Sequence, residues 1–157
     1  GAIPARNNRC DYIQKEQSTM QVNVKREKGL RFVGSNSRGA EVIMDPSVAA
    51  DGDAIGSSPM ELLLMGLGGC SSIDVVMILE KMRQPVTDCQ VTIDADRAET
   101  DPKVFTDIRM HFAVAGDGLS LDRVEHAVKL SAEKYCSASL MLGKAANITH
   151  SFEVLEN

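Results

Sequence analysis

Two cysteines, Cys70 and Cys136, lie in segments whose composition raises the question of thiol chemistry. Cys70 lies in GGCSSIDVVMILEK, within the most apolar part of the chain, and Cys136 lies in EKYCSASLML, beside a run of small residues. One chemistry open to such a pair is peroxide reduction, in which a thiolate becomes a sulfenic acid and a second thiol condenses with it to a disulfide. This requires two thiols that are close in space, a lowered pKa on the attacking thiol and a pocket for the peroxide.

Core packing is the alternative for the same cysteines. Cysteine is among the residues most often buried and commonly behaves as a small hydrophobic side chain. On composition alone this interpretation is favoured for Cys70 and Cys136, and strongly for Cys89, which takes an inward place in an alternating strand pattern. The distance between Cys70 and Cys136 in the folded chain separates the interpretations, because a disulfide requires Cβ atoms about 3.5–4.5 Å apart.

Other uses of cysteine and histidine find less support in the spacing. Zinc sites usually have ligands at short paired spacings, whereas the chain has no C-x-x-C, and His111, His126 and His150 do not pair at helical spacing. We therefore expect no metal, no other cofactor and no thioredoxin-type motif. A Cys–His nucleophile for acyl transfer stays open, although nothing places a histidine beside Cys70.

Composition narrows the class of protein. A chain of 157 residues with a net charge of -5 is long enough for one core and argues against nucleic-acid binding, which needs a basic face. The longest uncharged stretch in the apolar region, 62–73, has 12 residues, and a membrane span needs about 20. With four cysteines, no secretory signal and no membrane span, we expect a reducing, cytoplasmic setting.

The first third of the chain has the alternating apolar pattern of strands at residues 20–26, 30–34 and 40–45. Turn residues join them, which predicts an antiparallel meander. Residues 46–58 are expected to form a loop long enough to be a flap or a partner contact.

The N-terminal segment differs from the rest. Residues 1–19 are polar and show no clear period, so we expect a segment added for expression or a disordered segment, and a single domain over residues 20–157. Cys10 lies in this segment and receives no role.

A long helix is predicted next. Ser58 fits the N-cap, Pro59 the first helical position, and Glu61 completes a capping-box pattern. The helix is expected to run to about Arg83, and its first half is apolar on every side, which predicts burial. Glycines weaken a helix, so those in this half suggest that another backbone approaches closely. They are Gly66, Gly68 and Gly69.

The rest of the chain predicts strands at residues 86–99 and 105–116, a helix at 120–135, a short helix at 137–145 and a final strand at 147–156. This order indicates an α+β fold rather than a doubly wound sheet. The side chains expected to face inward on the first two of these strands are Cys89, Val91, Ile93, Ala95, Ile108, Met110, Phe112 and Val114.

The motifs SPMELLLMGLGGCSSIDV and KYCSASLMLGKAANITHSFEV together resemble the OsmC/Ohr family, most closely its YhfA-like branch, over nearly all of residues 20–157. The resemblance implies an intertwined homodimer in which antiparallel sheets wrap around two central helices. It also implies a thiol peroxidase that reduces organic hydroperoxides in oxidative-stress defence, with a lipoyl-type dithiol as reductant. By motif, Cys70 matches the peroxidatic cysteine and Cys136 the resolving one.

The family's peroxidases also use a glutamate and an arginine, and this chain lacks the glutamate at its usual position. The family's peroxidases use a glutamate directly after the helix-starting proline, where this chain has Met60, and Glu61 is rotated by about 100° around the helix. Glu61 is therefore a candidate whose capping role competes with a catalytic one. The family's arginine is matched best by Arg26, with Arg31 and Arg38 as substitutes.

Two hypotheses follow. The first is a cytoplasmic, dimeric thiol peroxidase for organic hydroperoxides. The second is an OsmC-fold protein without strong peroxidase activity, which binds a small apolar ligand or acts as a redox-sensing dimer. Met60 motivates the second hypothesis, because loss of a carboxylate that orients the arginine leaves the Cys70 thiol less activated.

Overall fold

The structure is a computed structural model that describes residues 19–47 and 53–156. Residues 1–18, which include Cys10, lie outside the described residues, as do residues 48–52 of the predicted loop. The expectations for these segments stay predictions.

The chain divides into two compact units, Gly1–Leu63 and Leu64–Asn157. The N-terminal unit holds an antiparallel sheet of three strands in the order β1-β2-β3. Its strands are β1 (Val22–Lys28), β2 (Arg31–Asn36) and β3 (Glu41–Met44). Gly29 turns β1 into β2 with a φ of 53°, which glycine adopts at no steric cost. The predicted meander is confirmed.

The long helix α2 (Pro59–Lys81) begins as the capping box predicts. The Ser58 backbone N–H donates to Glu61 Oε1 at 2.9 Å, and the Glu61 backbone N–H donates to Ser58 Oγ at 3.2 Å. The helix ends at Lys81, slightly before the predicted Arg83, because Arg83 has a left-handed φ of 59° that a continuing helix does not allow.

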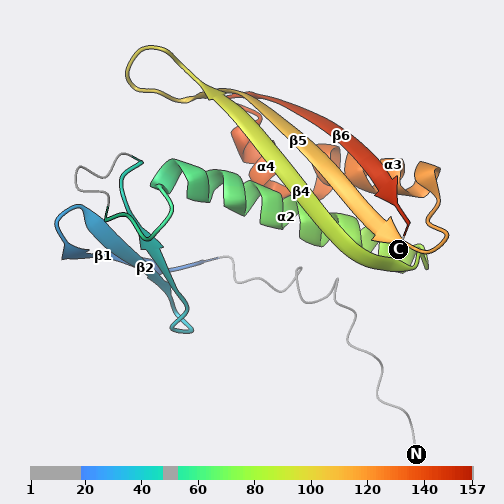
Figure 1. Cartoon of the computed structure of the whole chain (residues 1–157), viewed down its shortest axis with the longest axis horizontal. Helices are drawn as coiled ribbons and strands as arrows, with labels where there is room; N and C mark the ends of the chain where they lie inside the picture. The colour runs from blue at the N-terminus through green and yellow to red at the C-terminus, as the bar shows by residue number, and fades with distance from the viewer. Residues whose placement is uncertain (1–18, 48–52, 157) are drawn as a thin grey trace, which may run out of the picture. The chain divides into compact units, whose positions relative to one another are not determined.

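The C-terminal unit holds a second sheet, in the order β4-β5-β6, with helices over one of its faces (Figure 1). Its strands are β4 (Val86–Arg97), β5 (Phe105–Gly116) and β6 (Asn147–Leu155). β4 pairs antiparallel with β5, but β5 pairs parallel with β6, so this sheet is mixed rather than wholly antiparallel. Parallel neighbours need a crossover. It consists of α3 (Leu121–Leu130), the π-helical turn η1 (Ser131–Tyr135) and α4 (Ser137–Leu142).

The core of the C-terminal unit lies between this sheet and the helices. On β5 the predicted inward residues are all buried, and on β4 the predicted inward residues are half-buried, in alternation with exposed neighbours. On α2 the buried residues in this unit recur mostly every fourth position, which is one face of a helix. They are Leu67, Gly68, Ser71, Val75 and Leu79.

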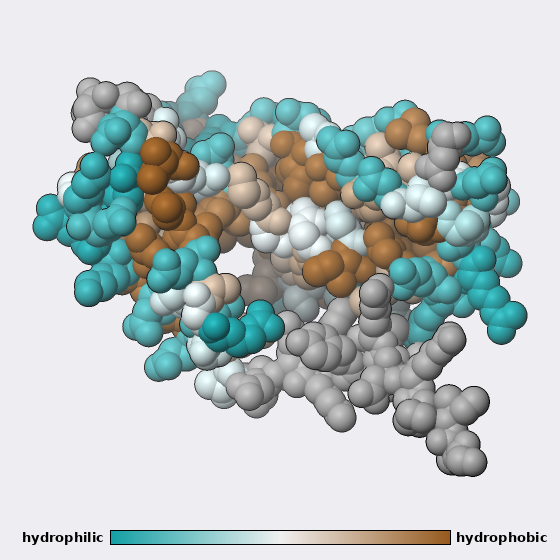
Figure 2. All heavy atoms as spheres, turned by 60° about the horizontal axis from the view of Figure 1, so that its bottom comes forward, coloured by the Kyte–Doolittle hydropathy of each residue, from teal (hydrophilic) through white to brown (hydrophobic). Residues whose placement is uncertain are grey.

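The composition of the first half of α2 predicts burial on every side. In the single chain, this half is buried on one face only. Leu63 is 49% exposed and Met65 is 54% exposed, because a single chain covers only one face of the helix. Hydrophobic residues, drawn in brown, are visible on one face of the molecule (Figure 2). The close approach at Gly68 is made by side chains, because a Cβ there would meet those of Val91 and Ile93. At Gly66 and Gly69 no described residue of this chain lies within 4 Å, and the expectation of a close backbone stays a prediction there.

The single helix predicted at 120–135 is divided. α3 ends at Leu130, and the chain widens into the π-helical turn η1, where the Cys136 backbone N–H donates to the Ser131 carbonyl at 2.9 Å. This five-residue hydrogen bond ends the first helix and places Cys136 at the N-cap of α4. Such π-helical turns occur frequently at functional sites.

Candidate active site

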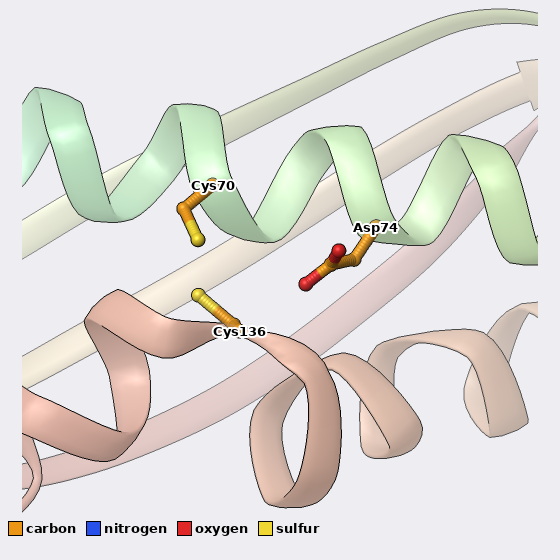
Figure 3. A group of neighbouring side chains, drawn as sticks. All are labelled: Cys70, Asp74 and Cys136. Carbon is orange, nitrogen blue, oxygen red and sulfur yellow. The ribbon is translucent and has the colours of Figure 1, made fainter. Parts of the chain in front are cut away.

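Cys70 and Cys136, far apart in sequence, lie together in the C-terminal unit. Cys70 projects from α2 and Cys136 from the start of α4, and their side chains point toward each other (Figure 3). Both are free thiols. Asp74 completes the cluster, since its carboxylate oxygen and the two sulfurs all lie within 4.8 Å of one another.

Local structure explains this convergence. Cys70 and Asp74 are four residues apart on α2, a spacing that places both side chains on the same helical face. The crossover between the parallel strands β5 and β6 then carries Cys136 over that face. The site is therefore built from one helix and the connection that the sheet topology requires.

Cys136 has the more strongly hydrogen-bonded thiol. It is 0% exposed, its sulfur lies 3.2 Å from Ser71 Oγ, and it accepts the Ser139 backbone N–H at 3.3 Å. Burial alone would raise the pKa of Cys136, but hydrogen bonds from Ser71, Ser139 and Cys70 lower the pKa below its ordinary value. The surroundings favour a thiolate here.

Cys70 has the opposite setting. It is half-buried, and burial raises the pKa of the Cys70 thiol to about 11, assisted by Cys136 and the negative charge of Asp74. The Ala138 backbone N–H lowers the pKa, but not enough to offset these effects. Cys70 is thus the more accessible thiol and the weaker acid.

Asp74 is also half-buried, and burial raises the pKa of its carboxyl, while a hydrogen bond from Ser131 opposes the rise. The Ser131 hydroxyl lies 3.3 Å from Asp74 Oδ2 and also 3.3 Å from the Ser71 carbonyl. Ser131 therefore connects the crossover to α2 next to the thiols.

Cys89 is free as well but lies on β4 and is not part of the cluster. Burial raises the pKa of the Cys89 thiol, and a hydrogen bond from Ser72 partly opposes this. Its predicted place on the inner face of the strand is consistent with this burial.

The candidate arginines belong to the N-terminal unit. Arg26 is exposed, and its Nε donates to the Gly29 carbonyl at 2.7 Å within the β1–β2 turn. Arg31 is buried, and its Nε donates to Asp45 Oδ1 at 2.9 Å. Arg38 is exposed in the next turn, where its backbone N–H donates to Asn36 Oδ1.

Glu61 makes the reciprocal capping-box contacts with Ser58 described above. The Ser58 backbone N–H and side chain lower the pKa of the Glu61 carboxyl. Met60, which occupies the position of the family's glutamate, is half-buried.

Comparisons with known proteins address the identity of this fold and site. Residues 50–151 match the family described as OsmC-like protein. Protein YhfA of Escherichia coli (strain K12) is 52% identical over 136 residues, which cover 87% of this chain and 98% of the relative. The chain belongs to the OsmC-like family.

Two solved structures illustrate the range of similarity. A hypothetical protein from Aquifex aeolicus VF5 is 32% identical with a TM-score of 0.79, covering 90% of this chain and 99% of that one. An organic hydroperoxide resistance protein OsmC from Legionella pneumophila, also described as a predicted redox protein, is 17% identical with a TM-score of 0.66. It covers 89% of this chain and 100% of that one, and at this identity it shares the fold alone.

Membership of the OsmC-like family also bears on whether α2 is a membrane span. By length and composition this helix could cross a membrane, and 28% of its most apolar window is buried within the chain. The uncharged stretch 62–73, by contrast, is too short for a membrane span. The family match, which includes all of α2, identifies it as the long helix of the OsmC-like fold.

Sequence reasoning missed the groups that surround the thiols in this OsmC-like site. Asp74 could have been found from its four-residue spacing to Cys70 on a predicted helix. The contacts of Ser71, Ser131 and Ser139 depend on how the crossover folds onto α2, and no local sequence pattern predicts them.

Proposed function

We propose that this protein is a thiol peroxidase that reduces organic hydroperoxides, with Cys70 as the attacking thiol and Cys136 as the resolving thiol. The observation that carries the proposal is the convergence of two free thiols of unequal exposure. Cys70 takes the first role because a peroxide can reach a half-buried thiol, whereas Cys136 is fully enclosed.

The hydrogen bond between the thiols suggests how the first step begins. The Cys70 S–H donates to the Cys136 sulfur, which favours the thiolate, so Cys70 gives up its proton to solvent and then attacks the terminal peroxide oxygen as a thiolate. The O–O bond breaks, Cys70 becomes a sulfenic acid, and the alkoxide takes a proton to leave as the alcohol. Cys70 is oxidised and the hydroperoxide is reduced.

The second step closes the disulfide. Cys136, again as the thiolate, attacks the Cys70 sulfenic sulfur, and the hydroxide leaves with a proton as water. An S–S bond of about 2.05 Å requires the sulfurs to approach more closely than they lie in the reduced chain. A dithiol of the lipoyl type then reduces this disulfide by thiol–disulfide exchange and is itself oxidised.

We further propose a cytoplasmic homodimer. The exposed apolar side chains of α2, Met65 and Ile73 in particular, are more than half exposed in the single chain. A second copy that packs on α2 would remove this surface from water, in agreement with the intertwined dimer that the family resemblance implies.

The alternative is a redox sensor or ligand-binding protein of the same fold with weak peroxidase activity. The raised pKa of Cys70 favours it, because few Cys70 thiols are ionised near neutral pH. Met60, which replaces the family's carboxylate, also favours weak peroxidase activity. Arg26 and Glu61 keep a catalytic role in the proposal only if their removal slows turnover.

The test is consumption of cumene hydroperoxide with dihydrolipoamide as reductant and a chelator present. Cys70→Ser is expected to abolish consumption, Cys136→Ser to trap a sulfenic acid that reacts with dimedone, and Cys89→Ser to leave the rate unchanged. Consumption no faster than the reductant alone would reject the peroxidase and favour the alternative. Arg26→Ala and Glu61→Gln, measured in the same assay, decide those two roles.

A further inference from the structure

We propose that reduced Cys70, Asp74 and Cys136 together form a binding site for a thiophilic divalent cation of the Zn²⁺ class. This goes beyond the peroxidase and does not depend on it, because metal binding needs only the reduced thiols. The three side chains converge from α2 and α4 on one point (Figure 3).

The distances suit such an ion. All three donor atoms lie within 4.8 Å of one another. Zinc binds sulfur at about 2.3 Å and carboxylate oxygen at about 2.0–2.2 Å, so tetrahedral ligands lie about 3.3–3.8 Å apart. Small side-chain rotations are enough to close the cluster around one ion.

The donor types select the ion. Two thiolates favour Zn²⁺ and other soft or borderline cations over Mg²⁺ and Ca²⁺, which prefer oxygen ligands. Asp74 supplies a third, anionic ligand from the position four residues after Cys70. The sequence did not predict this site because its ligands differ in type and Cys136 comes from a distant element.

Hydrogen bonds that would hold the ligands are already in place. Ser71 and the Ser139 backbone N–H contact the Cys136 sulfur, and the Ser131 hydroxyl contacts Asp74 Oδ2. Metal ligands in proteins are normally oriented by such outer contacts. The cluster has them on both sides, from α2 and from the crossover.

The unequal exposure of the ligands defines the remaining position. Cys136 is enclosed, whereas Cys70 and Asp74 are half-buried and face an accessible side. Open zinc sites have three protein ligands and leave the fourth position for water or a small anion, and this cluster has the same number of protein ligands. A bound ion would occupy both thiols, so metal binding and disulfide formation exclude each other.

The experiment is titration of the reduced, chelator-stripped protein with Co²⁺ under anaerobic conditions, followed by displacement with Zn²⁺. We expect saturation at one Co²⁺ per chain, with the sulfur-to-cobalt charge-transfer band of thiolate coordination. Oxidised protein should not bind. Cys89→Ser, the matched control, should bind as the unchanged protein does.

The variants decide the ligand set. Cys70→Ser and Cys136→Ser should lose the charge-transfer band at stoichiometric Co²⁺, and Asp74→Asn should weaken binding by at least about tenfold. Circular dichroism establishes that each variant folds. In the unchanged protein, Zn²⁺ should slow alkylation of Cys70 by iodoacetamide. Absence of saturable binding, or binding that Asp74→Asn leaves unaltered, would overturn the site whatever the peroxidase assay gives.

Discussion

Cys70 and Cys136 face each other within one cluster, and their thiol pKa values are shifted in opposite directions. The accessible thiol is the weaker acid, and the enclosed thiol is the stronger one. Access and ionisation are therefore divided between two residues, with the Cys70–Cys136 hydrogen bond connecting them. This division leads to the first two predictions.

The peroxidase rate should rise with pH well above neutrality. A Cys70 pKa of about 11 means that the attacking thiolate is scarce at pH 7 and increases about tenfold per pH unit until the pKa is approached. The measurement is the initial rate of hydroperoxide consumption from pH 6 to 10, with Cys70→Ser as the blank. A plateau below pH 8 would show that another group activates Cys70.

The Cys136 thiol should titrate below the ordinary cysteine value, because Ser71 and Ser139 stabilise the thiolate. Ultraviolet thiolate absorbance during a pH titration measures this in a variant whose other cysteines are serine. Ser71→Ala should raise the midpoint by about one unit, through loss of one hydrogen bond to the charged sulfur.

Ser72→Ala is the matched control for that titration, since Ser72 lies next on α2 but hydrogen-bonds Cys89. It should leave the Cys136 midpoint where it was. An equal rise in both variants would assign the effect to a general disturbance of the helix.

Much of the fold was predictable because its patterns are local. Alternation of side chains located the strands, and the Ser58–Glu61 capping box located the start of α2. The parallel pairing of β5 with β6 was not predictable, since pairing direction depends on how the crossover packs. The π-helical turn before Cys136 has no pattern of its own either.

The candidate site was predictable only in part. The family motifs selected Cys70 and Cys136, and the structure brings them together. Asp74 was overlooked because its one signal, the four-residue spacing to Cys70 on a predicted helix, belongs to no motif. Arg31 was ranked below Arg26, yet it is the buried arginine of the N-terminal unit, a difference that only tertiary packing creates.

Removing the helix cap should destabilise the protein. Ser58→Ala loses the hydrogen bond that the Glu61 backbone N–H donates to Ser58 Oγ, and it should cost about 1 kcal/mol in the free energy of unfolding. Urea denaturation measures this, and Ser58→Thr, which keeps a hydroxyl, should cost less. Equal losses for the two variants would attribute the effect to packing of the buried Ser58 side chain.

The buried pair of Arg31 and Asp45 should stabilise the N-terminal unit in a pH-dependent way. Backbone N–H groups of Gly56 and Ile55, together with Arg31, lower the pKa of Asp45 against the effect of burial. The contribution is therefore complete above the unfolded-state pKa, about 3.9, and is lost as pH falls through the lower folded-state value.

Asp45→Asn tests this pair. The variant should have a lower denaturation midpoint at pH 7 and a weaker loss of stability between pH 5 and 2. Asp96→Asn is the control, because Asp96 pairs with Arg109 at 2.9 Å where both side chains are at least half exposed. An exposed ion pair contributes little, so the two variants should differ clearly, and similar curves would contradict a special role for Asp45.

The exposed face of α2 should be a contact between two copies of the chain. Ile73 is 54% exposed there, and an aspartate at this position would place a charge in an apolar interface, at a cost that a dimer does not tolerate. Ile73→Asp should shift the sedimentation profile to the monomer. Val104→Asp, at a similarly exposed position before β5, should remain dimeric. A dimer that survives Ile73→Asp, or an unchanged protein that sediments as a monomer, would place the subunit contact elsewhere or remove it.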